Sequence, residues 1–159
     1  MCEPSGALPQ PELICQPKFA LFIGWSRQIL HLSDGRTLVV SSPGENGGQY
    51  LYFVNSSDLT TERFSIPENH GSASNAVVGP DGHVVLPPHK DGCVYTFDVK
   101  THALTPFAVG YPKAEMTWGS VAAKNGRVYF GSYPTATLGE FDPATGTCEF
   151  WQHTVPDTR

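Results

Sequence analysis

The sequence lacks the features that mark several large classes of protein. Only 16% of its 159 residues are charged, and the net charge is −5. A mildly acidic chain without a cluster of lysine or arginine repels phosphate backbones, so nucleic acid is not expected as a partner. No apolar run approaches the ~20 residues that span a bilayer, so no membrane partner is expected either.

The first residues also lack the basic region and the continuous apolar region of a signal peptide. The location of the protein is therefore open, with the cytoplasm as the default. The four cysteines, Cys2, Cys15, Cys93 and Cys148, lack the CxxC spacing of zinc sites. We expect four reduced thiols, with Cys93 and Cys148 packed as small apolar residues in strands.

Glycine and proline are plentiful instead, with 16 and 14 residues. Apolar residues make up 40% of the chain and aromatic residues 11%, which is enough material for a hydrophobic core. The length of 159 residues suits one domain. This composition favours many short strands joined by tight turns, and therefore an all-β fold.

A repeat organises most of the chain. Three segments, which begin at Ile29, Ala76 and Ser120, each contain a short apolar segment, a turn and a second apolar strand. The turns contain the pairs Asp34-Gly35, Asp81-Gly82 and Asn125-Gly126. We expect these pairs to supply the positive φ angles of a two-residue hairpin turn.

Two further strands complete each unit. A strand rich in aromatic residues follows the first hairpin, as in YLYFV and CVYTF. The next turn opens on Asn55, Asp98 or Asp142, whose side chains can close Asx turns. The fourth strand then ends around Phe64, Phe107 or Phe150.

The spacing of these units predicts the architecture. Asp34, Asp81 and Asn125 lie 47 and 44 residues apart. A four-stranded antiparallel unit of ~40–50 residues is typical of a β-propeller blade. The segments GPDGHVVLP, RVYFGSYP and LGEFDPATG also resemble repeats of the broad propeller superfamily. That group includes propellers of the gluconolactonase/regucalcin, streptogramin-lyase, NHL and quinoprotein types.

We therefore predict three blades, at about residues 25–67, 71–110 and 116–157, after a proline-rich segment at residues 1–24 that could add one closing strand. Closed propellers have about four to eight blades, so three form a partial propeller with two open apolar faces. Three explanations stay open. The chain is part of a longer protein, two copies form a homodimer that completes a ring, or an open stack is capped by its own N-terminal segment.

The resemblance also predicts where a ligand would bind. In propellers, the loops between the second and third strands and the connections between blades emerge on one face, at the mouth of the channel. Ligands of such proteins usually bind there. The candidate ligand-binding residues on these segments are Glu68, Asn69, His70, His89, Lys90, Glu115, Trp118 and Tyr133. No catalytic residue is assigned.

The polar candidates have two interpretations. Glu68, Asn69 and His70 could ligate a divalent cation together, or they form a polar surface loop. His89 could be a general base beside the cationic Lys90, or both lie at the solvated tip of a hairpin.

The aromatic candidates also have two interpretations. Trp118 and Tyr133 could stack on a sugar or a peptide at a concave mouth, or Trp118 packs between blades. We predict a binding or interaction scaffold, without a cofactor, for a small molecule, a carbohydrate or a protein segment. The alternative, which the resemblance implies, is a lactonase, hydrolase or lyase that uses a divalent cation.

Overall fold

The computed structural model describes residues 26–41, 49–67, 70–111, 116–134 and 136–151. Twelve strands in these ranges form three four-stranded antiparallel sheets, each with its strands in chain order. The predicted all-β class and its three four-stranded units are therefore confirmed. The predicted closing strand within residues 1–24 lies outside the described residues.

The first sheet contains β1 (Ser26–His31), β2 (Arg36–Ser41), β3 (Gln49–Asn55) and β4 (Thr61–Ile66). The second contains β5 (Val77–Val78), β6 (Val84–Leu86), β7 (Cys93–Phe97) and β8 (Leu104–Ala108). The third contains β9 (Met116–Ala122), β10 (Val128–Tyr133), β11 (Leu138–Asp142) and β12 (Thr147–Trp151). The 3-10 turn η1 (Ala73–Asn75) precedes the second sheet, and no helix among the described residues could cross a membrane.

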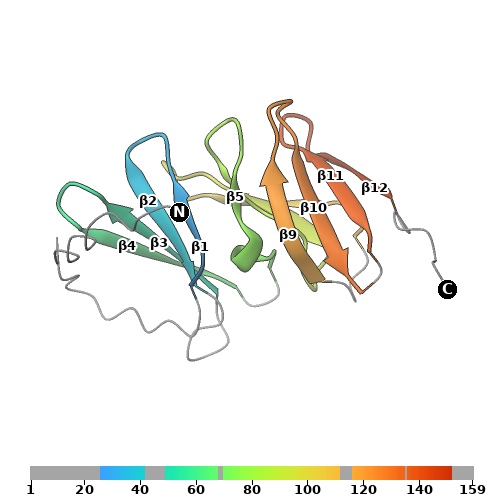
Figure 1. Ribbon diagram of the computed structural model, residues 1–159, viewed down its shortest axis with the longest axis horizontal. Coiled ribbons are helices and arrows are strands. Elements are labelled where there is room, and N and C mark those ends of the chain that lie inside the picture. Colours follow the sequence, from blue (N-terminus) through green and yellow to red (C-terminus); the bar gives the residue numbers. More distant parts are fainter. Residues whose placement is uncertain (1–25, 42–48, 68–69, 112–115, 135, 152–159) are drawn as a thin grey trace, which may run out of the picture.

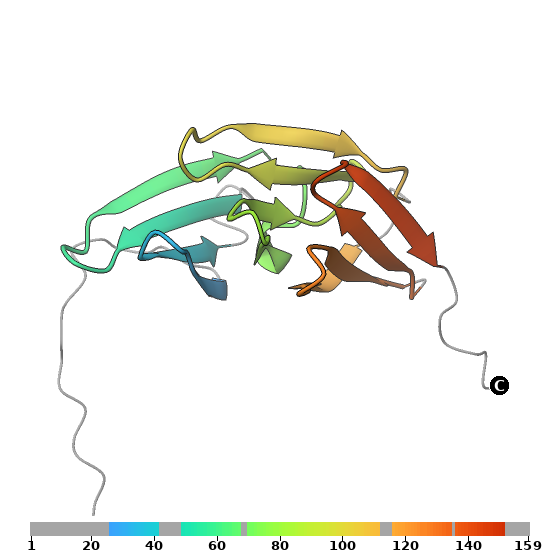
Figure 2. The same ribbon diagram turned by 90° about the horizontal axis from the view of Figure 1, so that it is seen from above.

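The three sheets stand side by side in an open arc (Figure 1). Seen from above, β1, β5 and β9 lie on the concave side of the arc, and β4, β8 and β12 lie on the convex side (Figure 2). The first strand of every unit therefore faces the same central space, as the repeat predicts.

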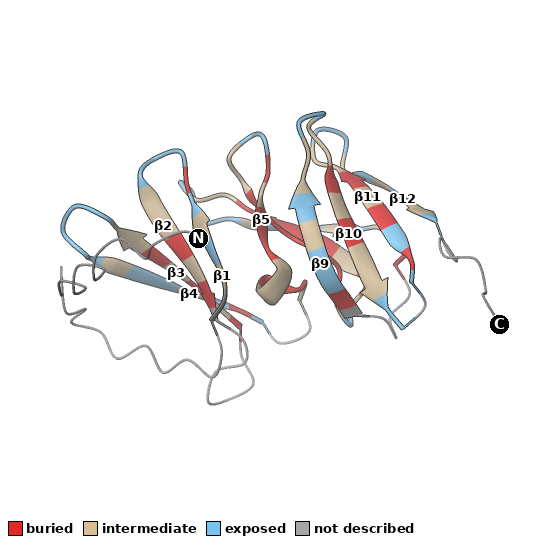
Figure 3. Cartoon of the chain, in the orientation of Figure 1, coloured by how far each residue is buried: buried red, intermediate tan, exposed pale blue. Residues whose placement is uncertain are grey.

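Two apolar cores hold the sheets together, and the middle sheet contributes to both. Because successive side chains of a strand point to opposite faces, Leu86 of β6 packs toward the first sheet and Val85 packs toward the third. Leu86 meets a core that includes Leu38, whereas Val85 meets a core that includes Phe130. All four residues are at most 1% exposed, and buried residues concentrate between the sheets (Figure 3).

The turn between the first two strands of each sheet is not the predicted two-residue turn. In the first sheet the backbone N–H of Gly35 donates to the carbonyl of Leu32 at 3.1 Å, and the N–H of Leu32 donates to the carbonyl of Arg36 at 2.9 Å. Gly35 has a φ of 86°, whereas Asp34 does not have a positive φ. The hairpin therefore has a three-residue loop that closes on a single left-handed glycine.

The same loop recurs at Gly82 and Gly126, with φ angles of 84° and 89°. The residues before these glycines have a different role from the predicted one. The side-chain Oδ1 atoms of Asp34, Asp81 and Asn125 accept backbone N–H groups two residues later at 3.0–3.1 Å. The later turns at Asn55, Asp98 and Asp142 make the predicted Asx bonds at 2.7–3.0 Å.

Cys93 and Cys148 lie half-buried in β7 and β12, and each packs against one of the two cores. Burial, with a smaller contribution from Glu140, raises the pKa of Cys148 to about 12. Its thiol therefore stays protonated at neutral pH and acts as a small apolar side chain.

A buried glutamine joins the first sheet to the segment that leads into the second. Nε2 of Gln49 donates to the carbonyl of Gly71 at 3.0 Å, and its Oε1 accepts the backbone N–H of Ala73 at 2.8 Å. Gln49 is 7% exposed and Ala73 is fully buried. Because these backbone groups are shielded from water, the side chain of Gln49 satisfies them where no strand pairing does.

Replacing Gln49 with methionine should therefore lower the free energy of unfolding by about 2–4 kcal/mol, since buried backbone groups lose their partners. Gln28 provides a matched control, because its Oε1 is buried and has no hydrogen-bond partner among the described residues. Gln28→Met should change stability by less than about 1 kcal/mol. Urea unfolding of both variants measures this difference, and equal losses would contradict the role given to Gln49.

Candidate ligand-binding site

The arc has two ends that differ in chemistry. One end is formed by residues 70–76, 87–92, 133–134 and 136–137. The connections between sheets and between second and third strands lie there, and we call it the loop end. The tight turns lie at the other end, which we call the turn end. It is formed by residues 32–35, 79–83 and 98–102. Those predicted ligand-binding residues that the structure describes lie at the loop end.

Three of the predicted residues, Glu68, Asn69 and Glu115, lie outside the described residues. The other five are described, and all lie on segments at the loop end: His70, His89, Lys90, Trp118 and Tyr133. Among the described residues, no group of three or more histidine, cysteine, aspartate or glutamate side chains could hold a metal ion. The predicted divalent cation at Glu68, Asn69 and His70 therefore stays a prediction.

Trp118 and Tyr133 form an exposed aromatic pair at the loop end of the third sheet. Their ring centroids are 5.8 Å apart, and the rings meet edge to face. Trp118 is 65% exposed and Tyr133 is 59% exposed, so neither side chain packs in a core. Trp118 therefore does not pack between two described sheets, and its role as a contact surface stays a prediction.

Hydrogen bonds fix the backbone beneath this pair. Oγ1 of Thr117, which is 4% exposed, donates to the carbonyl of Pro88 at 2.8 Å. Nδ2 of Asn75 donates to the carbonyl of Thr117 at 2.6 Å. Trp118 therefore lies at an end of β9 that two hydrogen bonds hold in place. One joins it to the segment before β5, and the other joins it to the loop that carries His89.

His70 packs against the second sheet. Its ring lies 5.2 Å from the ring of Tyr95, centroid to centroid. The hydroxyl of Tyr95 donates to Oδ2 of Asp91 at 2.6 Å. Burial and this hydrogen bond both raise the pKa of Tyr95, so the hydroxyl remains a donor at every physiological pH.

His89 and Lys90 do not share the fully solvated position predicted for a hairpin tip. Lys90 is exposed, but His89 is half-buried, and its Nδ1 has no hydrogen-bond partner among the described residues. Burial lowers the pKa of His89, Lys90 lowers it further, and Asp91 acts in the opposite direction. The imidazole is therefore neutral at pH 7, so it can accept a proton or a hydrogen bond from a ligand.

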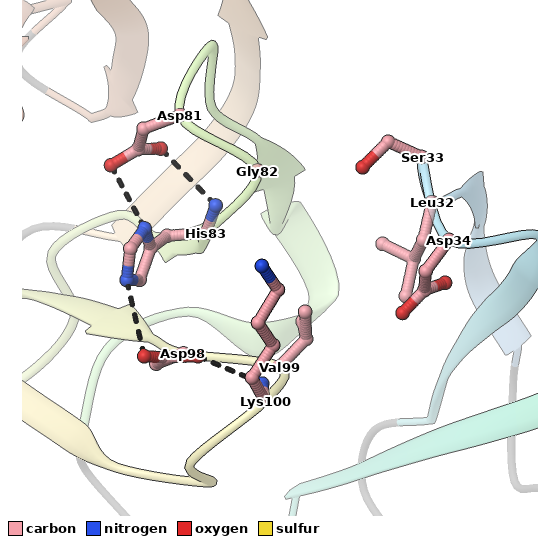
Figure 4. A pocket seen from close by; sticks show the side chains of 9 residues that line it. All are labelled: Leu32, Ser33, Asp34, Asp81, Gly82, His83, Asp98, Val99 and Lys100. Carbon is pink, nitrogen blue, oxygen red and sulfur yellow. Dashed lines mark hydrogen bonds and ion pairs between the residues drawn. The ribbon is translucent and has the colours of Figure 1, made fainter.

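The turn end contains a cavity of about 200 Å³ that the sequence did not predict. It lies between the first and second sheets (Figure 4). Residues of three tight turns line it: Leu32, Ser33, Asp34, Asp81, Gly82, His83, Asp98, Val99 and Lys100. Asp34 and Asp81 occupy equivalent turn positions and line opposite sides of the cavity, because the repeat places these turns at the same end of neighbouring sheets (Figure 4).

The carboxylates of this cavity already have structural partners. Nδ1 of His83 lies 2.9 Å from Oδ2 of Asp81, at ion-pair distance rather than in an aligned hydrogen bond, and its Nε2 lies 3.7 Å from Oδ2 of Asp98 (Figure 4). The backbone N–H of Lys100 holds the pKa of Asp98 below its usual range, and Thr101 adds to this effect. These carboxylates accept backbone N–H groups of their own turns, so they are less available to bind a ligand than the polar groups of the loop end.

Comparison with known proteins addresses the fold. No family model matches the sequence, and no curated protein matches it. The structure is similar to virginiamycin B lyase from Staphylococcus aureus, with a TM-score of 0.61 and 11% identity over 82% of this chain and 41% of that one. It is also similar to a streptogramin B lyase, with a TM-score of 0.63 and 16% identity over 80% of this chain and 40% of that one.

A third similar structure is a catalytically inactive histidine-to-alanine variant of the Staphylococcus aureus virginiamycin B lyase with quinupristin. Its TM-score is 0.59, with 15% identity over 80% of this chain and 40% of that one. These lyases are β-propeller enzymes. The chain has a β-propeller fold. It spans about 40% of the length of these neighbours and forms a partial propeller, as predicted.

The burial of His89 predicts a pH dependence of stability. The unfolded chain binds a proton on His89 near the ordinary pKa of 6.5, whereas the folded chain resists this protonation. The stability that His89 contributes is therefore present above pH 6.5 and is lost as the pH falls below this value toward the lower pKa of the folded state. Thermal unfolding at pH 7.5 and 5.5 should show a larger loss for the wild type than for His89→Asn.

The comparison with His89→Asn isolates this residue, because every other group is the same in both proteins. An equal loss of melting temperature in the wild type and the variant would show that His89 titrates as an exposed residue.

Proposed function

We propose that this chain is a β-propeller scaffold that binds a carbohydrate at its loop end. The exposed pair of Trp118 and Tyr133 carries the proposal. Flat aromatic rings stack on the apolar faces of sugars, while neighbouring polar groups bind the hydroxyls. An indole that is 65% exposed contributes nothing to the two cores, so its position is best explained by a contact outside them.

Polar groups suited to sugar hydroxyls lie on the adjacent loop. The exposed ammonium of Lys90 can donate, and the neutral imidazole of His89 can accept. The bond between Thr117 and Pro88 ties this loop to the strand that carries Trp118. A site fixed by its own hydrogen bonds loses little entropy when a ligand binds, which favours measurable affinity for a small sugar.

Binding to a panel of immobilised mono- and oligosaccharides tests the proposal. Trp118→Ala should weaken binding to any sugar that the wild type retains by at least about tenfold, and Tyr133→Ala should weaken it in the same direction. Leu59→Ala is the matched control, since Leu59 is 38% exposed and lies in the turn between β3 and β4, away from the loop end. Unchanged binding by both loop-end variants would contradict the proposal.

An enzyme of lyase type is the second candidate. The similarity to lyases and the neutral imidazole of His89 at the loop end favour it. Incubation with quinupristin, followed by chromatography, tests for conversion of the compound. Conversion that is lost in His89→Asn would favour a lyase, and no conversion by the folded wild type would favour the scaffold.

A divalent cation belongs to this second candidate. Glu68, Asn69 and His70 are the residues proposed to hold it. If they do, Mg²⁺ or Ca²⁺ should raise the melting temperature of the wild type but not of Glu68→Gln, because an ion that binds only the folded state stabilises it. Equal melting temperatures with the cation and with a chelator would contradict a metal site.

A further inference from the structure

Two sheet faces of this partial propeller pack on no other described sheet. The outer face of the first sheet contains Ile29, Val39, Tyr50, Tyr52 and Arg63. The outer face of the third sheet contains Val121, Tyr129, Leu138, Glu140 and Glu149. Ile29 is 63% exposed and Val121 is 58% exposed, so both faces present large apolar side chains to solvent.

The strand register identifies the residues of the first and second sheets that correspond to the exposed residues on the outer face of the third sheet. Tyr129 lies four residues after the turn residue Asn125, and its partners across the sheet are Val121 and Glu140. The same register positions in the other sheets hold buried core residues or, at Leu30, a partly buried residue packed against a core. Val121 corresponds to Leu30 and Val77, Tyr129 corresponds to Leu38 and Val85, and Leu138 corresponds to Leu51 and Val94.

The outer face of the first sheet has the complementary pattern. In the second and third sheets, the residues at the same register positions pack against the sheet that precedes them in the chain. Val39 corresponds to Leu86 and Phe130, Tyr52 corresponds to Tyr95, and Val54 corresponds to Phe97 and Phe141. Tyr95 is 5% exposed in the core between the first two sheets, so an aromatic ring is accommodated at this position when a neighbouring sheet is present.

The outer face of the third sheet also has room for a side chain. A shallow hollow of about 220 Å³ lies over it, lined in part by Gly119, Val121, Gly131 and Leu138. A Cβ atom added at either glycine would meet nothing within 4 Å. The two glycines lie opposite each other on β9 and β10, so the hollow is a feature of the sheet and not of a loop.

The charges of the two faces are opposite. The strands of the first sheet contain one carboxylate, Glu62, which lies on the inner side within 3.5 Å of Arg36. Its outer face has the cationic Arg63, which lies over the ring of Tyr50 at 5.4 Å. The outer face of the third sheet instead has an excess of carboxylates, since Glu140, Asp142 and Glu149 are accompanied by one cation, Arg127.

We propose that a second copy of this chain occupies both faces. The outer face of the first sheet of each copy packs on the outer face of the third sheet of the other copy. Because each contact joins two different faces, two copies close into a ring of six sheets, three from each chain, with two equal contacts. The loop ends of both copies then surround one channel.

Light scattering of the full chain on a sizing column tests this proposal. The wild type should have twice the 17.2 kDa mass of one chain. Ile29→Lys and Val121→Lys should each raise the dissociation constant of the dimer by about 100-fold, because each change occurs in both contacts and an unfavourable 1.4 kcal/mol per contact is a factor of ten. Leu59→Lys, at a turn residue that is 38% exposed, is the matched control and should remain dimeric.

Mixing variants of the two faces distinguishes this arrangement from other dimers. A mixed pair has one contact made of two unchanged faces and one contact that combines both changes. Tagged Ile29→Lys should recover Val121→Glu more strongly than it recovers Val121→Lys, because the changed contact then joins a lysine to a glutamate and not to a second lysine. Circular dichroism confirms that all three variants are folded.

Several outcomes would overturn the proposal. A wild type that is folded and monomeric at 100 µM would overturn it. So would a dimer that only one of the two variants disrupts, since that pattern indicates a contact between identical faces. Equal recovery of Val121→Glu and Val121→Lys, or recovery of an unrelated protein in place of the second copy, would also overturn it.

Discussion

Each sheet of this protein has apolar side chains on both faces, and these require a neighbouring sheet if they are to be removed from water. The middle sheet meets this requirement fully, with Leu86 in one core and Val85 in the other. The two flanking sheets meet it on one side only. Burial of apolar area provides the main favourable free energy of folding, so the packing of each sheet against its neighbour follows from this constraint, whereas the two outer faces do not meet it.

Polar groups fix the loop end where apolar packing does not reach. Gln49 binds the backbone at Gly71 and Ala73, and Asn75 binds the strand that carries Trp118 through Thr117. These bonds connect all three sheets at the concave side of the arc. An aromatic pair mounted on such a base is held in place without being buried, which is the property that a binding surface requires.

The repeat allowed the strands and the three units to be predicted, because apolar alternation and turn residues are local signals. The two-residue turn was wrong: Asp34 is a hydrogen-bond acceptor, and only Gly35 takes a positive φ. The bonds of Gln49 and the turn-end cavity at His83 had no local signal, since each joins residues of different sheets. The positions of Glu68, Asn69 and Glu115 remain predictions.

An experimental structure of the protein as it assembles in solution tests the role of the sheet faces most directly. We expect a closed ring in which Val39 and Tyr52 of one copy pack over the glycine-lined hollow beside Val121 of the other. A structure in which these two faces remain open to solvent would show that an apolar sheet face in this protein is stable alone, and would contradict the constraint on which the arc depends.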